Sequence, residues 1–509
     1  MSPSTSPSGE PRVSIPSPQN GGEEGVYPLS HAQQRIWLTE QFHPGTPIAN
    51  LAGLLTVRGP VRLELLAEAL YRFARGTEAL QLEFLVRGGQ LHQRRSSRPV
   101  PRPEEVDFSA EADPQAAAER WGSARARTPF PLFEGPLFQL AVVKLGEGRG
   151  GYFACLHHLI GDGFSLGLLA RSVNRIYEAL LAGKEPEVSG GSYARYVERE
   201  RAWLASPAAE EDRRLWLERL SGLDEPALLR AVGSPLDGTR TVRHSLVLDE
   251  ATSAEVVRHA QGSGSTLARF FAALTGLFVS RLTGRRDVCL GTFVHGRSAR
   301  EDLRTCGMMV GTVPLRFQVE RGAPFEQLLR GVGTAQNQAL KLSRYPFDLL
   351  AQQLRAGGLD GAPLFDVLVS FQNGRFDAQL DGHPVDIHWF SNGHETHTLA
   401  VHVNDRTGQG RLQLDLDFRE SAFPEELPAV LAESLRHLLD EVLAGAREGK
   451  ERPVSGLSVV SPRQAARQAA WNPEPRPFPR EHTVAELLSQ RAAREPGRVA
   501  VRAGTRRLT

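Results

Sequence analysis

Cysteine is scarce in this sequence, since only Cys155, Cys289 and Cys306 occur among 509 residues. Thiols so few and so widely spaced form neither a disulfide framework nor a cysteine-based metal cluster. The chain also lacks an apolar run long enough to span a bilayer, and its first residues lack the apolar core of a signal peptide. These absences predict a cytoplasmic protein with reduced cysteines.

Neither sign of charge is in excess. The 60 lysines and arginines nearly cancel the 59 aspartates and glutamates, so composition gives no electrostatic reason to expect nucleic acid or an anionic membrane as a partner. A hydrophobic content of 40% with 23% charged residues is ordinary for a soluble globular protein. The length predicts about two to four domains or large lobes.

Composition also separates the two ends from the rest of the chain. Residues 1–26 are rich in Ser, Pro and Gly and predict a disordered N-terminal tail. Proline, arginine and polar residues gather again near the C-terminal end, where residues 461–480 predict a linker. Between these segments, strand and helix patterns alternate in both halves, which indicates an α/β (α+β) fold.

The clearest helix follows residue 163. Its apolar residues recur at spacings of three and four, which aligns them on one face: Leu166, Leu169, Val173, Ile176 and Leu180. Further helices are predicted over residues 30–42, 63–74, 266–282 and 424–446, and between 193 and 232. Strands are predicted over residues 51–57, 79–86, 137–145, 152–156, 241–248, 287–294, 313–319, 365–372, 385–390, 399–404 and 410–418.

The most informative motif is HHLIGDG, residues 157–163, which lies between an apolar strand pattern and this helix. A strand that ends in two histidines brings an imidazole to the rim of a sheet, and the side chains of His157 and His158 point to opposite faces. A neutral imidazole accepts a proton near pH 7, as a general base must. Asp162 suits a helix N-cap, and its flanking glycines suit a turn.

This heptad resembles the signature of the condensation domains of nonribosomal peptide synthetases, which belong to the chloramphenicol-acetyltransferase-like superfamily. Other segments resemble further motifs of the family in the same order: LSHAQQRIW (Leu29–Trp37), LGTFVHGR (Leu290–Arg297), MVGTVPLR (Met309–Arg316), YPFDLL (Tyr345–Leu350) and PLFDVLVSFQN (Pro363–Asn373). The similarity covers about residues 27–460. Residues 481–509 resemble the beginning of an adenylation domain and are predicted to be a truncated start of one.

The resemblance implies two acetyltransferase-like lobes, residues 27–192 and 193–460, in a V-shaped pseudo-dimer with a central tunnel. It implies three catalytic residues. His158 and His157 act at the middle of the tunnel, and the backbone N–H of Gly163 helps to position the thioester oxygen. It also implies that Asp162 and Arg297 form an ion pair that supports the site.

Four residues are predicted to form tunnel wall, namely Met309, Gly311, Ser370 and Gln372. Many peptide-forming members of the family have Phe and Asn at the first two of these positions, so an ordinary peptidyl donor is doubtful. His157 argues against the heterocyclising relatives, which have Asp there. The segment FHPGTPIANLAG, residues 42–53, resembles starter condensation domains, which attach an acyl chain to the first amino acid of a lipopeptide.

The resemblance thus implies amide formation between an acyl group and an aminoacyl thioester. The expected donor is an acyl-CoA or an acyl carrier protein, the acceptor is a downstream aminoacyl carrier protein, and an adenylation domain adjoins. No intrinsic cofactor or metal is implied, because phosphopantetheine arrives with the substrates. Two alternatives stay open: an elongating domain with a peptidyl donor, and a noncatalytic recruitment platform. Cys155 is interpreted as a buried, inert thiol within an apolar strand rather than a nucleophile.

Overall fold

The computed structural model describes residues 25–188, 190–223, 226–230, 237–356, 363–372, 379–404, 411–448, 452–471 and 479–509. Almost all of the predicted N-terminal tail, residues 1–24, lies outside this description. The chain divides into two compact units, Met1–Val459 and Val460–Thr509. None of the described helices is both long and apolar enough to cross a lipid bilayer.

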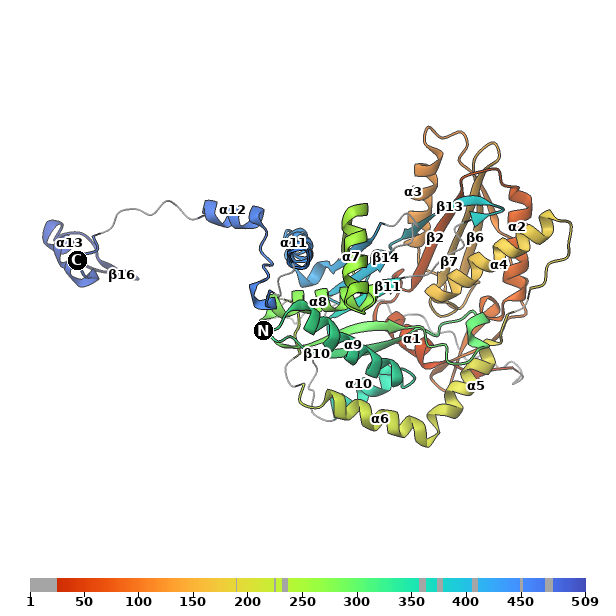
Figure 1. Ribbon diagram of the computed structural model, residues 1–509, viewed down its shortest axis with the longest axis horizontal. Helices are drawn as coiled ribbons and strands as arrows, with labels where there is room; N and C mark the ends of the chain where they lie inside the picture. Colours follow the sequence, from red (N-terminus) through yellow and green to blue (C-terminus); the bar gives the residue numbers. More distant parts are fainter. Residues whose placement is uncertain are drawn as a thin grey trace, which may run out of the picture. The chain divides into compact units, whose positions relative to one another are not determined.

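Two six-stranded mixed sheets organise the first unit (Figure 1). The first sheet has the order β12 (Gln379–Leu380), β13 (His383–Phe390), β2 (Asn50–Val57), β7 (Arg149–His157), β6 (Phe138–Gly146) and β5 (Glu104–Asp107). The second has the order β10 (Gly311–Gln318), β9 (Asp287–Val294), β11 (Val367–Gln372), β14 (Leu399–Asn404), β15 (Gln413–Arg419) and β8 (Thr241–Val247). The mixed α/β class expected from the sequence is therefore confirmed.

The first sheet is not built from the N-terminal segment alone. Strand β13 pairs antiparallel with β2, with Val385 opposite Val57 and Phe390 opposite Ala52. Residues 379–390 thus complete the sheet of residues 27–192, although they lie within the segment predicted as the second lobe, 193–460. Local patterns predict that a strand exists at 385–390, but they do not specify its pairing partner across more than 300 residues.

Helices cover both faces of the first sheet. Helices α2 (Leu63–Gly76) and α4 (Gly163–Leu181) lie side by side beside it in Figure 1, and α2 packs on β6 and β7. Helix α3 (Pro114–Ala126) packs against the other face, where Trp121 contacts Phe153 at 5.0 Å between ring centroids. Alternate residues of a strand point to opposite faces of its sheet. Because helices cover both faces here, nearly every position of β7 is buried.

The second sheet contributes to two apolar clusters, a large one and a small one. Four helices pack with the sheet in the large cluster: α7 (Glu250–Gly262), α8 (Leu267–Thr283), α9 (Phe325–Lys341) and α11 (Leu427–Arg447). A smaller apolar cluster involves α6 (Pro207–Leu220), α10 (Phe347–Ala356) and residues of β9, such as Cys289.

The remaining elements include two helices and a small sheet. Helices α1 (His31–Phe42) and α5 (Tyr193–Leu204) contain residues that contact both halves of the unit. A separate three-stranded sheet joins β1 (Tyr27–Pro28), β4 (Gln90–Arg95) and β3 (Leu82–Arg87). The second unit contains α12 (Pro462–Trp471), α13 (Val484–Arg494) and a hairpin of β16 (Val501–Ala503) and β17 (Arg506–Leu508).

Two predicted elements differ from those observed. The strand predicted over 79–86 begins only at Leu82, because residues Glu78–Gln81 form a 3-10 turn first. The helical region predicted between 193 and 232 ends at Leu220, and residues 226–230 are not helical. Short apolar runs fit a turn, a strand or a buried helix equally well, so periodicity alone does not separate them. The predicted linker, 461–480, contains helix α12, and its residues 472–478 are outside the description.

Candidate active site

His157 is the last residue of β7, and protein groups occupy both of its ring nitrogens. The backbone N–H of Leu159 donates to Nδ1 at 3.1 Å, which leaves the proton of a neutral ring on Nε2. Nε2 lies 3.3 Å from the Glu40 carboxylate, and both side chains are buried. The structure therefore places His157 as a support of the turn, on the same face as Phe130, whose ring lies edge-on to it.

His158 follows the end of the strand and is half-buried. Its backbone N–H donates to the carbonyl of Ala49, and its Nδ1 lies 3.0 Å from the carbonyl oxygen of Gly161. Because a carbonyl only accepts, the proton is on Nδ1 and the lone pair is on Nε2. Within the described part of the chain, Nε2 has no hydrogen-bond partner, so this nitrogen can accept a proton from a substrate.

Burial of the His158 ring lowers its pKa to about 4, and this effect outweighs the nearby Asp162 charge, which raises it. The ring is therefore neutral at all ordinary pH values. A neutral imidazole is ready to accept a proton, but its conjugate acid is strong and gives the proton up readily.

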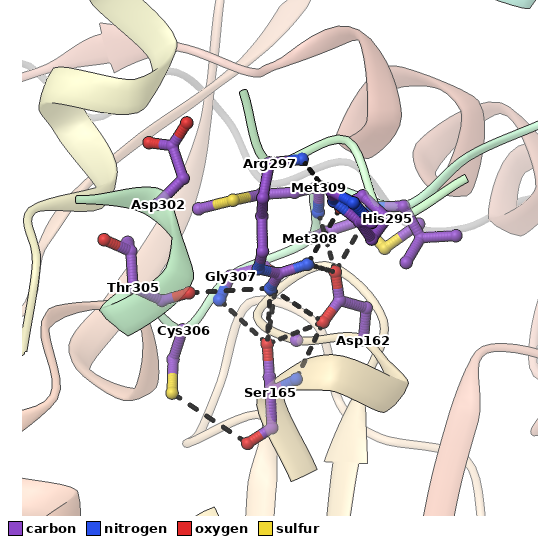
Figure 2. Close-up of polar contacts among 12 residues, drawn as sticks. Asp162, Ser165, His295, Arg297, Asp302, Thr305, Cys306, Gly307, Met308 and Met309 are labelled. Carbon is purple, nitrogen blue, oxygen red and sulfur yellow. Dashed lines mark hydrogen bonds and ion pairs between the residues drawn. The ribbon is translucent and has the colours of Figure 1, made fainter. Parts of the chain in front are cut away.

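Asp162 caps helix α4 and lies at the centre of a buried hydrogen-bond network (Figure 2). Its carboxylate accepts from the backbone N–H and the hydroxyl of Ser165 at 2.9 and 2.8 Å. It also accepts from the backbone N–H groups of Met309 and Val310 at 3.1 and 3.2 Å. The capping aspartate thus joins the end of the first sheet to the segment that leads into β10.

Arg297 forms a two-pronged ion pair with the same carboxylate. Its Nη1 and Nη2 atoms lie 2.9 and 3.0 Å from the two oxygens of Asp162, and both side chains are completely buried. Burial alone would raise the pKa of Asp162, but the Arg297 charge and these hydrogen bonds lower it overall. The guanidinium also donates to the carbonyl of His295 and lies over the Phe164 ring, 4.2 Å from its centroid.

Gly296 permits this arrangement. It has a φ of +64°, and a Cβ at this position would lie 1.8 Å from the carbonyl oxygen of Met309. Any other residue would therefore push apart the two segments that Asp162 holds together.

Gly163 is the first residue of α4 and is exposed, with no atom within 4 Å of where a Cβ would stand. Its backbone N–H belongs to the first turn of the helix, whose N–H groups have no acceptor within the helix. Helix N-termini stabilise negative charge, so this turn can stabilise an oxygen that gains charge.

The four expected wall residues separate into two pairs. Met309 and Gly311 both line a cavity of about 70 Å³ between α1, α5 and the start of α10, which also contains Arg35 and His31. Ser370 and Gln372 lie on β11 and do not line this cavity. Ser370 is buried, and the amide of Gln372 lies 3.3 Å from Nδ1 of His402.

Sequence reasoning missed several residues that hold this site. Tyr193 donates its hydroxyl to the carbonyl of Met308 at 2.7 Å and also contacts the hydroxyl of Ser30, the N-cap of α1. Arg35 donates to the carbonyl of Val310 at 3.1 Å. Of the missed residues, only Ser165 could have been found from the local sequence, because the residue three positions after an N-cap aspartate donates its backbone N–H to that aspartate.

The family model of the condensation domain matches residues 23–467, so the chain belongs to the condensation domain family. Members of this family form amide bonds by acyl transfer from a thioester to an amine. Their fold has two lobes, to which the two sheets correspond.

Among curated relatives, surfactin synthase subunit 1 of Bacillus subtilis (strain 168) is 26% identical over 92% of this chain and 13% of its own length. The isonitrile lipopeptide synthase of Streptomyces coeruleorubidus is 28% identical over 95% of this chain and 32% of its own length. The chain therefore spans less than a third of the length of each of these relatives.

Among solved structures, a mutant of the starter condensation domain of rhizomide synthetase RzmA in complex with C8-CoA has a TM-score of 0.76 at 28% identity. The match covers 85% of this chain and 98% of that structure. The first condensation domain of the calcium-dependent antibiotic synthetase, with a substrate analogue, has a TM-score of 0.75 at 26% identity and covers 86% of this chain and 100% of that structure.

Proposed function

We propose that this chain is a starter condensation domain, which joins an acyl group to the amine of the first aminoacyl thioester on a downstream carrier protein. The observation that carries the proposal is the structural similarity to a starter domain crystallised with C8-CoA, with a match that covers 98% of that domain's chain. The segment of residues 42–53 and the departures at Met309 and Gly311 support the same subtype. The donor is an acyl-CoA or an acyl carrier protein.

In the proposed reaction, the acceptor nitrogen attacks the thioester carbonyl carbon, and Nε2 of His158 takes the proton that the nitrogen loses. The carbon–sulfur bond then breaks, and the leaving sulfur receives this proton, so that an amide and a free thiol result. The N–H groups at the start of α4, Gly163 among them, stabilise the oxygen while it carries negative charge. The hydrogen bond from Nδ1 to Gly161 keeps Nε2 directed to the reaction.

The pH dependence of this reaction follows from two groups. An α-amine has a pKa of about 7.7–8.0 and attacks only as the neutral form, whereas His158, with a pKa of about 4, is already neutral. We expect kcat/KM for the acceptor to rise about tenfold per unit from pH 5.5 to 7, and to level off above pH 8. A pH–rate profile with a second inflection near 6.5 would show that His158 titrates as an ordinary histidine.

A donor panel tests the starter assignment. A carrier loaded with an amino acid is incubated with this chain and acyl-CoAs of two to sixteen carbons, and the carrier is examined by mass spectrometry. We expect an acylated aminoacyl carrier, formed much more slowly by His158→Ala. If only peptidyl or aminoacyl carriers serve as donors, the chain is an elongating domain. If no donor of any kind reacts while another protein binds, it is a recruitment platform.

A further inference from the structure

A second cavity, distinct from the surroundings of His158, lies in the half of the first unit that contains the second sheet. Its volume is about 350 Å³, and it is lined by residues of α10, of the segment 363–366 before β11 and of the segment 396–398. Neither His158, Asp162 nor Arg297 belongs to its lining. The proposed reaction gives this cavity no role.

One side of the cavity is apolar. Phe347 and Phe365 pack together with ring centroids 5.3 Å apart, and Leu354 and Leu364 extend this wall. Phe365 and Leu364 are buried, so their positions are fixed by the core. Such a wall favours a ligand with an apolar body, because removal of apolar surface from water stabilises the complex.

The other side carries positive charge from Arg230, Arg355 and Arg419. Arg419 is held by its donations to the carbonyls of Gly238 and Thr396. The guanidinium groups of Arg230 and Arg355 form no ion pair with any carboxylate in the described ranges of the chain. Their charge is therefore not neutralised by a direct partner there.

Asp366, the one carboxylate of the described lining, is already engaged. It accepts from the backbone N–H groups of Leu229 and Arg230 at 2.9 and 3.2 Å. Burial raises its pKa, in spite of these hydrogen bonds. The described lining of the cavity consequently carries more positive than negative charge.

His397 lies between the two sides and is oriented from two directions. Its Nδ1 is 2.8 Å from Glu395, and its ring stacks on Phe365 at 5.8 Å with only 10° between the planes. No described residue bonds to its Nε2. Because the Glu395 carboxylate only accepts, the proton of the neutral ring is on Nδ1, and Nε2 can accept a hydrogen bond from a ligand in a fixed direction.

We infer that this cavity binds a small amphipathic anion, with its phosphate or carboxylate at Arg230 and Arg355 and its apolar body against Phe347 and Phe365. Arginine pairs with both kinds of head group through two parallel N–H donors. The same chemistry has two sources near such an enzyme: the phosphate of a pantetheine arm and the carboxylate of a fatty acid. Phe347 also belongs to the lining of the smaller cavity that Met309 and Gly311 line. The inference does not depend on the proposed acyl transfer.

Calorimetric titration of the whole chain tests the inference with four ligands: 4′-phosphopantetheine, pantetheine, octanoate and octanol. We expect an anion to bind, and its uncharged counterpart to bind at least tenfold more weakly. Arg230→Ala and Arg355→Ala should each raise the Kd about tenfold or more, since each removes charge-assisted hydrogen bonds. Arg258→Ala, at an exposed position of α7, is the matched control and should leave the Kd unchanged.

The titration distinguishes the two possible sources of the ligand from a result that overturns the inference. Preference for 4′-phosphopantetheine identifies a pantetheine arm, and preference for octanoate identifies a fatty acid. His158→Ala should retain this binding, although it slows acyl transfer. The inference is overturned if neither anion binds, or if the Kd is the same in both arginine variants as in the parent while their melting temperatures are unchanged.

Discussion

Replacement of His158 by alanine lowers kcat by about 10²–10⁴-fold, the usual contribution of a general base. The reason is that Nε2 of this ring is the nitrogen without a protein partner among the described residues, held in place by the bond from Nδ1 to Gly161. Activity does not vanish, because correct placement of two bound reactants removes about 7–11 kcal/mol of barrier by itself. Single-turnover acylation of a loaded carrier measures the loss.

Two further histidine variants show whether that loss is specific to His158. His92→Ala, which changes a half-buried histidine of β4, should leave kcat unchanged. His157→Ala should lower the melting temperature, because it leaves the buried Glu40 carboxylate without this partner. A His158→Ala protein that folds and acylates at the parental rate would exclude His158 as the base.

Loss of either member of the Asp162–Arg297 pair destabilises the protein by about 3–5 kcal/mol, the range found when one partner of a buried ion pair is removed. Arg297→Ala leaves a buried carboxylate with only neutral donors, and Asp162→Asn leaves a buried guanidinium without a counter-charge. Asp162→Asn also weakens the acceptor for the N–H groups of Met309 and Val310. Denaturant unfolding of both variants measures the change in free energy.

A double variant separates the charge from the packing. Asp162→Asn with Arg297→Met removes both charges, so it should lose less stability than the two single variants added together. Single variants with the parental free energy of unfolding would contradict the prediction.

The sequence alone predicts the local parts of this site and little of their assembly. The spacing of Leu166 to Leu180 specifies α4, and the apolar run before His157 specifies the end of β7. Asp162 as the N-cap follows from its position. These features depend on neighbours in the chain, which periodicity and capping rules describe.

Contacts between distant segments follow from no local rule. The partner of His157 is Glu40, 117 residues away, and Tyr193 bonds to the carbonyl of Met308, 115 residues away. The pairing of Asp162 with Arg297 was expected only from the family resemblance, and the structure shows its geometry. Sequence patterns predict which elements form, whereas packing decides which elements meet.

The pairing of β13 with β2 has a consequence for synthesis of the chain. At about 5–20 residues per second, the ribosome adds residues 385–390 on the order of 20–70 s after it has made β2. During that interval β2 is a nascent edge strand with unpaired N–H and C=O groups, open to pairing with other chains. A polypeptide that ends before residue 379 keeps this edge permanently, so the N-terminal half expressed alone should aggregate rather than fold as an independent domain.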